Sequence, residues 1–174
     1  MNENEYLSLI LEDLESEHTP DESWQESPHR WILERPSGTK GAIARKIVAR
    51  WALASGLQLS NYGLDRQRLL RDGDEIYQVK SSTMWKTGKY RFQQFRKISY
   101  DYAVLLGIAP HEIHLWIIPK EAIQTHIEGS NGQHTGAGAT ETDWYEIDPY
   151  NPPFWLDEWG GTPEAARRVL NELI

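Results

Sequence analysis

Gln78 and Lys80 lie in the segment 75–81 (EIYQVKS), whose apolar and β-branched residues predict a strand. Side chains alternate along a strand, so Gln78 and Lys80 point to one face and Val79 to the other. A lysine in an inner strand is costly to bury unless an anion meets it, and a bound phosphate would supply that anion. Asp65 ends an earlier expected strand, so pairing of neighbouring strands could bring its carboxylate beside Gln78. The types and spacing of these residues favour a site that binds a phosphate group and catalyses chemistry on it.

Three other acids are alternatives to Asp65 as a metal ligand. Asp72 and Asp74 flank a glycine and are more simply explained as turn residues. Glu75 is an odd number of residues from Lys80, so in a regular strand it faces the opposite side. Asp65 is therefore the preferred acid.

The motif formed by these residues has a counterpart in a known family. Asp65, then Gln78-x-Lys80 on the next long strand, then Ser81-Ser82 and a glutamine-containing helix, resembles the PD-(D/E)xK nucleases, the restriction-endonuclease-like superfamily. The resemblance covers residues 38–118, where the expected order of helix, three strands, helix and strand is that of the family's core. It implies a mixed sheet flanked by helices.

The resemblance also extends to chemistry, and the segment from Tyr90 to Lys120 is itself similar to bacterial restriction-endonuclease-like proteins. It implies a Mg²⁺ ion, replaceable by Mn²⁺, held by Asp65, by the residue at position 78 and by the main-chain carbonyl of Val79. It implies that Lys80 orients the attacking water or stabilises the pentavalent phosphate. Phosphodiester hydrolysis needs such a set, because the metal polarises the phosphoryl group and a cation offsets transition-state charge.

Two features depart from the family's usual pattern. Position 78 holds Gln where most members have Asp or Glu, although a Gln-x-Lys variant occurs and an amide oxygen can coordinate a hard cation. Many members carry an acid on the first helix, and here that helix carries bases instead, Arg45 and Lys46 among them. A further acid would have to come from elsewhere, such as Glu34.

A run of basic, aromatic and amide residues follows the motif and is a candidate surface for nucleic acid. Bases can bind phosphates, and amides can contact base edges or order water near a metal. The alternative is an ordinary amphipathic helix, and Gln93 and Gln94 are equally good candidates for the residue nearest the active site. The candidate DNA-binding residues are Lys86, Lys89, Arg91, Gln93, Gln94, Arg96, Lys97 and, in a later loop, His134.

Charge is distributed unevenly along the chain, although the formal net charge is −8. Residues 38–99 hold thirteen bases and four acids, while the segments on either side are acidic. A polyanion responds to a local patch more than to the total, so the middle segment is a candidate phosphate-binding surface, with scattered solvated charges as the alternative. Cysteine is absent, which excludes thiolate zinc sites and cysteine nucleophiles and is typical of a reducing compartment.

The histidines and the aromatic residues near the C-terminus are weaker signals. His111 and His114 straddle a turn and a strand, so we expect no structural zinc site there. We expect the aromatic residues between Trp144 and Trp159 to pack the C-terminal segment onto the domain, with a partner or dimer surface as the alternative.

Periodicity and turn residues predict one mixed sheet of about five strands flanked by helices, an α/β (α+β) fold. In chain order we expect a helix at 4–17, a connection at 18–37, a helix at 40–55, strands at 57–64, 67–70 and 75–81, a polar loop at 82–89, a helix at 91–100, strands at 102–108 and 113–118, a short helix at 119–127, a long loop at 128–143 and a helix at 162–173.

These features predict a single domain, with an acidic N-terminal part at 1–37, a catalytic core at 38–127 and a loop and C-terminal helix at 128–174. The expected function is a cytoplasmic, Mg²⁺-dependent DNA endonuclease of restriction or defence type, able to form a homodimer. The alternatives are a structure-specific repair or junction nuclease, a non-catalytic nucleic-acid-binding module, and an inhibitor whose acidic ends mimic DNA. We expect no signal peptide and no membrane span.

Overall fold

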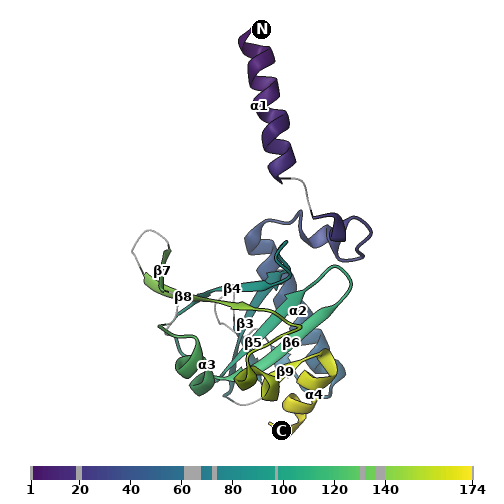
Figure 1. Cartoon of the computed structure of the whole chain (residues 1–174). Coiled ribbons are helices and arrows are strands. Elements are labelled where there is room, and N and C mark those ends of the chain that lie inside the picture. Colours follow the sequence, from purple (N-terminus) through teal and green to yellow (C-terminus); the bar gives the residue numbers. More distant parts are fainter. Residues whose placement is uncertain are drawn as a thin grey trace.

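The computed structural model describes residues 2–18, 21–60, 68–71, 74–96, 98–129, 132–135 and 140–173. A mixed sheet lies at the centre of the molecule, with strand order β1-β2-β3-β5-β6-β9 (Figure 1). Its strands are β1 (Leu59–Ser60), β2 (Arg68–Arg71), β3 (Ile76–Thr83), β5 (Tyr102–Ile108), β6 (Ile113–Pro119) and β9 (Gly160–Gly161). The predicted mixed sheet flanked by helices is confirmed, and its two outermost strands are two residues long.

Strands β3 and β5 are parallel, and every other pairing in this sheet is antiparallel. Parallel neighbours need a crossover, and here it runs through residues 84–101 over one face of the sheet. The carboxyl ends of β3 and β5 therefore lie at the same edge, which is where open α/β sheets usually bind ligands.

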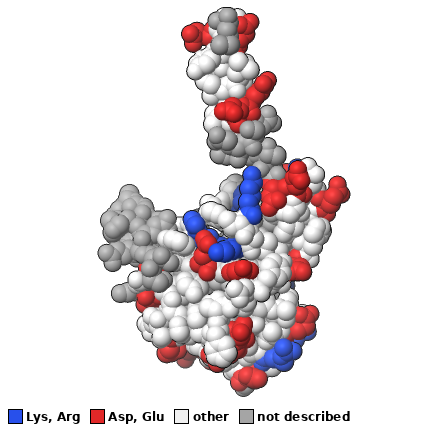
Figure 2. All heavy atoms as spheres, viewed as in Figure 1, with Lys and Arg blue, Asp and Glu red and all other residues white. Residues whose placement is uncertain are grey.

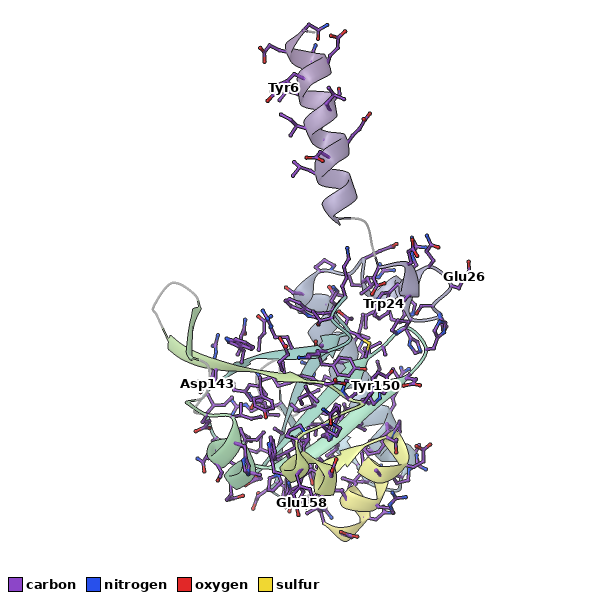
Figure 3. The ribbon with its side chains drawn as sticks, viewed as in Figure 1. Tyr6, Trp24, Glu26, Asp143, Tyr150 and Glu158 are labelled. Atoms are coloured by element: carbon purple, nitrogen blue, oxygen red, sulfur yellow. The ribbon has the colours of Figure 1, made fainter. Side chains whose placement is uncertain are left out.

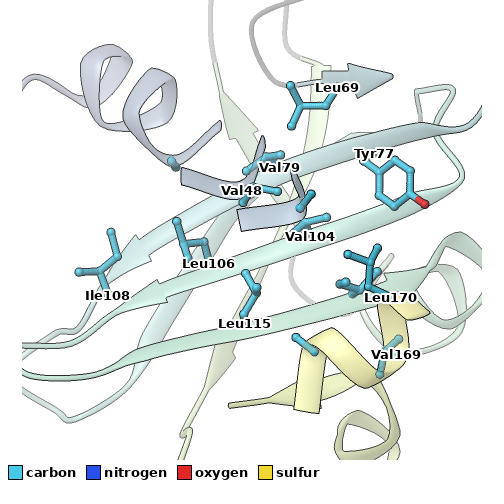
Figure 4. Packing of buried hydrophobic residues seen from close by; sticks show 14 of the residues in the cluster. Val48, Leu69, Tyr77, Val79, Val104, Leu106, Ile108, Leu115, Val169 and Leu170 are labelled. Atoms are coloured by element: carbon cyan, nitrogen blue, oxygen red, sulfur yellow. The ribbon is translucent and has the colours of Figure 1, made fainter. Parts of the chain in front are cut away.

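Helices α2 (Ser37–Ala54) and α4 (Pro163–Glu172) pack against one face of this sheet. Both helices were predicted within three residues of their ends. Figure 4 shows the apolar side chains between them and the strands, with Val48 of α2 close to Val79 and Leu106. Burial of this apolar area is the main stabilising contribution.

The opposite face is covered by a second sheet and short helices, and here the prediction was wrong. Residues 91–100 were expected to form a helix, but Tyr90–Phe95 form strand β4, which pairs with β8 (Thr140–Ile147). The expected loop at 128–143 contains β7 (Gly132–Thr135) and the beginning of β8. The C-terminal third is therefore not a loop followed by a helix, because it supplies strands to both sheets.

A bulge explains why β4 has helical spacing in the sequence. Between Phe92 and Phe95 strand β4 advances three residues while β8 advances two, from Tyr145 to Asp143. The extra residue restores the facing, so Phe92 and Phe95 are both buried although they stand three positions apart. Such a pair is indistinguishable from an i, i+3 helical pair in the sequence alone.

The predicted N-terminal helix is present as α1 (Glu3–His18), but its apolar stripe is not buried in this chain. Figure 1 shows α1 projecting away from the sheets, and Figure 3 shows Tyr6 pointing off it into solvent. Tyr6 and Leu11 are 52% and 66% exposed. No helix in the described ranges is both long and apolar enough to cross a membrane.

The segment after α1 is anchored to the domain more firmly than the expected surface connection. It forms two short 3-10 helices, η1 (Glu22–Trp24) and η2 (Arg30–Ile32), and buries Trp24 and Ile32. The Ser27 hydroxyl donates a hydrogen bond to the carbonyl oxygen of Pro110. The helix α3 (Lys120–His126) and the 3-10 helix η3 (Phe154–Trp159) complete the β4-side cover through Ile123 and Leu156.

Candidate nucleic-acid interface and active site

A pocket of about 320 Å³ lies along the carboxyl half of β3. In the described part of the chain β2 pairs with β3 from Ile76 to Gln78, and the pocket begins at the next residue, Val79. The first turn of α2 and strand β4 form the other walls. We call this hollow the edge pocket, and its lining includes Ser37, Lys40, Gly41, Val79, Lys80, Ser81, Ser82, Thr83, Trp85, Arg91, Gln93 and Gln94.

Lys80 is 5% exposed and points toward β4. Its ammonium group donates a hydrogen bond to the main-chain carbonyl of Gln94 at 2.6 Å. Gln94 has φ +59°, a left-handed conformation that is uncommon outside glycine, and it stands at the bulge of β4. The bulge thus directs a carbonyl at Lys80, and backbone strain of this kind is frequent at functional sites.

Gln78 is fully buried on the same side of β3 as Lys80. Among the described residues, neither atom of its side-chain amide has a hydrogen-bond partner. An unsatisfied buried amide costs about 1–3 kcal/mol, so the position is poor for stability alone. An amide oxygen is a ligand that Mg²⁺ accepts, and Gln78 directly precedes the residues of β3 that line the edge pocket without lining it itself.

The charged residues that line the edge pocket are all cations among the described residues. Lys40, Lys80 and Arg91 line it, and none of its described lining residues is an Asp or Glu. The first turn of α2 also faces the pocket, and its N-cap residue Pro36 makes no side-chain capping bond, so main-chain N–H groups there remain available to an anion. The pocket is therefore suited to an anion such as phosphate.

Arg91 is held rigidly at the rim of the pocket. Its guanidinium carbon lies 4.3 Å from the ring centroid of Trp85 and 4.5 Å from that of Trp144. Its Nη2 atom pairs with the Glu146 carboxylate at 3.1 Å, and Lys89 reaches the same carboxylate at 3.7 Å. Two cations thus share one acid, so the local charge stays positive. Figure 2 shows Lys and Arg side chains next to acidic ones in the upper part of the body.

The structure brings together part of the predicted set. Val79, Lys80, Arg91, Gln93 and Gln94 all line the edge pocket, whereas Lys86 lines a separate hollow beside His111 and Tyr150. Arg96 is partly buried after the end of β4.

For three of the predicted site residues, the position of the side chain is outside the described part of the structure. Asp65 and Lys97 lie outside the described residues, and His134 belongs to β7 with its side chain outside them. Within the described ranges no three His, Cys, Asp or Glu side chains cluster as a metal site would require.

Glu75 and Glu34 contribute nothing to the pocket. Glu75 pairs with Arg71 at 2.9 Å and accepts a hydrogen bond from the Tyr77 hydroxyl, on the face opposite to Lys80. The prediction that Glu75 faces away from Lys80 is confirmed. Glu34 is exposed and does not line the edge pocket.

Sequence reasoning missed Lys40 and the hydroxyl residues around it. The signal was the sequence Pro36-Ser37-Gly38, a helix start without a capping side chain, preceding a lysine. Nothing in that pattern specified that this helix start would meet the end of β3, because only the tertiary arrangement does so.

The β4 layer also holds a buried polar pair away from the pocket. The Tyr90 hydroxyl and His114 Nδ1 are 2.7 Å apart, and His114 Nε2 lies 3.6 Å from a Glu112 carboxylate oxygen. Burial lowers the pKa of the His114 ring below its usual value, while Glu112 acts in the opposite direction. A neutral ring with its proton on Nε2 accepts a hydrogen bond from the Tyr90 hydroxyl at Nδ1, so the pair links β4 to β6 without a net buried charge.

No protein-family model matches this chain, and no curated protein matches it significantly.

Proposed function

We propose that this chain is a metal-dependent DNA endonuclease that hydrolyses phosphodiester bonds at the edge pocket. The observation that carries the proposal is the buried pair on one face of β3: Gln78 with an unsatisfied amide, and Lys80 lining a pocket rich in cations. A buried amide without a partner opposes stability, so a cation that binds its oxygen is the simplest reason to keep Gln78, and Lys80 adds a positive charge for an anion on the same face.

Chain connectivity supports Asp65 as the acid that completes the site. Asp65 precedes Arg68 by three residues, so their Cα atoms are at most about 11 Å apart. Arg68 is the register partner of Gln78. This connection is short enough for the Asp65 carboxylate to approach the Gln78 amide, and we propose that it does so.

Each residue has a distinct role in the proposed site. Asp65, the Gln78 amide oxygen and the Val79 carbonyl would hold Mg²⁺ or Mn²⁺, which supplies Lewis-acid polarisation of the phosphoryl group and an activated water when bound. Lys80 places a positive charge where negative charge develops on the phosphate, and the Gln94 carbonyl fixes the ammonium group. Lys40 and Arg91 bind neighbouring phosphates of the DNA backbone. We place the enzyme in the cytoplasm, since a chain without cysteine is consistent with a reducing compartment.

A non-catalytic nucleic-acid-binding module is the second candidate, and one observation favours it. No carboxylate lines the edge pocket among the described residues, so the cations alone could bind a backbone without cleaving it. The two functions differ in their need for a metal.

Incubation of the purified chain with supercoiled plasmid tests the proposal. We expect nicking with Mg²⁺ or Mn²⁺, no nicking with EDTA, and loss of nicking by about 100-fold or more in Asp65→Ala and Lys80→Ala, because each removes transition-state charge stabilisation. Lys46→Ala, an exposed lysine on α2 that does not line the pocket, is the matched control. Full activity in either site variant, with circular dichroism unchanged, would contradict the assignment.

A further inference from the structure

Trp85 places an aromatic surface in the same pocket as the cations. It lines the edge pocket and is 43% exposed, although it is a large apolar side chain. Its backbone is fixed by the β3–β4 turn, where Trp85 N–H donates to the Lys89 carbonyl at 2.9 Å and Gly88 N–H donates to the Trp85 carbonyl at 2.9 Å. Gly88 has φ +75°, the left-handed conformation that such a tight turn needs.

The ring itself is held by the Arg91 stack. The Arg91 guanidinium contacts both the Trp85 ring and the Trp144 ring, and it pairs with the Glu146 carboxylate. A ring fixed in this way loses little conformational entropy when a flat ligand stacks on its open surface. The arrangement is thus a preorganised stacking surface.

Cations beside an exposed aromatic ring are the combination that binds single-stranded nucleic acid. Bases in a duplex have their faces covered by their neighbours, so only an unpaired base offers a face to an indole. The pocket volume of about 320 Å³ is at the small end of the range for small-molecule sites, about 300–1,000 Å³. The pocket is therefore of a size suited to a single nucleotide.

From these contacts we infer that Trp85 stacks on an unpaired nucleobase whose phosphate lies among Lys40, Lys80 and Arg91. This inference rests on the proposed function and specifies its substrate class: DNA that is single-stranded or distorted at the point of cleavage. Intact duplex is then bound through its backbone alone and is the poorer substrate.

Binding in EDTA separates this inference from catalysis. The probe is a short single strand carrying one 2-aminopurine, compared with the same strand in a duplex, against the full-length chain. We expect Trp85→Ala to weaken single-strand binding about tenfold, equivalent to about 1.4 kcal/mol, and duplex binding less than twofold. Wild-type protein quenches the 2-aminopurine fluorescence, Trp85→Ala does not, and Trp85→Phe restores most of the quenching.

Phe154→Ala is the matched control, because Phe154 is 93% exposed and does not line the pocket. It should leave both affinities unchanged. Equal losses on single strand and duplex, or no loss on either, would overturn the stacking inference while leaving wild-type nicking intact. A selective loss in Trp85→Ala without metal-dependent nicking by the wild type would support stacking and reject the nuclease.

Discussion

Toward α2 and α4, strand β3 buries Tyr77 and Val79; toward β4 it buries Gln78, Lys80 and Ser82. The first face packs side chains that water excludes and needs no further explanation. The second buries an ammonium group and an unsatisfied amide, both of which oppose folding. Neighbouring residues of one strand share the same backbone constraints. The difference between the two faces of β3 therefore separates the side chains that stabilise the fold from the side chains that a ligand would contact.

The largest effect on stability should come from the apolar face. Leu106 is 1% exposed and lies in the cluster beneath α2 (Figure 4). Leu106→Ala should lower the free energy of unfolding by about 2–5 kcal/mol, because it removes buried area and leaves a cavity. Urea denaturation measures this value, and a change below about 1 kcal/mol would show that the α2 face is not the principal core.

Gly107 on β5 tests how tightly the β4 side of the sheet is packed. A Cβ at this position would lie 2.5 Å from the Tyr90 ring, which is fully buried and cannot move aside easily. Gly107→Ala should therefore destabilise by about 1–3 kcal/mol through overpacking. Tyr90→Leu in the same background should recover part of the loss, and the double-mutant cycle in urea measures it. Additive losses would contradict a direct clash.

Gln78 should behave in the opposite sense to Leu106. Gln78→Met replaces two unsatisfied polar atoms with an apolar side chain of similar length, so unfolding should cost about 1–3 kcal/mol more than in the wild type. The same variant should lose metal-dependent nicking. A destabilised variant in thermal and urea melts would mean that the amide is satisfied in solution, and the contrast between the faces would fail.

The buried histidine gives a smaller, pH-dependent effect. The pKa of His114 in the folded chain lies below its ordinary value of 6.5. Above that value both states are neutral, whereas below it the unfolded state binds the proton first, so stability falls as pH falls toward the folded pKa. One proton contributes at most about 1.4 kcal/mol per pH unit. Urea melts between about pH 7 and pH 5 give the free energy of unfolding at each pH, and this free energy should change less with pH in His114→Gln than in the wild type. An identical pH dependence in the two proteins would exclude the His114–Tyr90 pair as its cause.

The sequence predicted the central sheet well because long, apolar strands leave few alternatives. Segments 102–108 and 113–118 match β5 and β6 closely, since continuous apolar runs bounded by turns are the clearest strand signal. The alternation of Gln78, Val79 and Lys80 also held, because it follows from strand geometry alone.

The β4 layer could not be predicted in the same way. Phe92 and Phe95 have helical spacing only because of the bulge at Gln94, and β8 lies in a stretch without apolar alternation. The contacts that make the edge pocket, from Lys40 to Arg91, join residues about fifty positions apart. Tertiary packing brings these residues together, and the local sequence pattern does not predict such contacts.

Nicking rate against Mg²⁺ concentration, for the wild type, Gln78→Glu and Gln78→Ala, tests the central claim most directly. A carboxylate at position 78 restores an anionic ligand of the same reach, so Gln78→Glu should keep or raise activity at low Mg²⁺. Gln78→Ala should lose activity, since it removes the ligand beside Lys80. A wild type without metal-dependent cleavage of duplex, single-stranded or branched DNA, with affinity unchanged in both variants, would contradict the account and leave a binding module in its place.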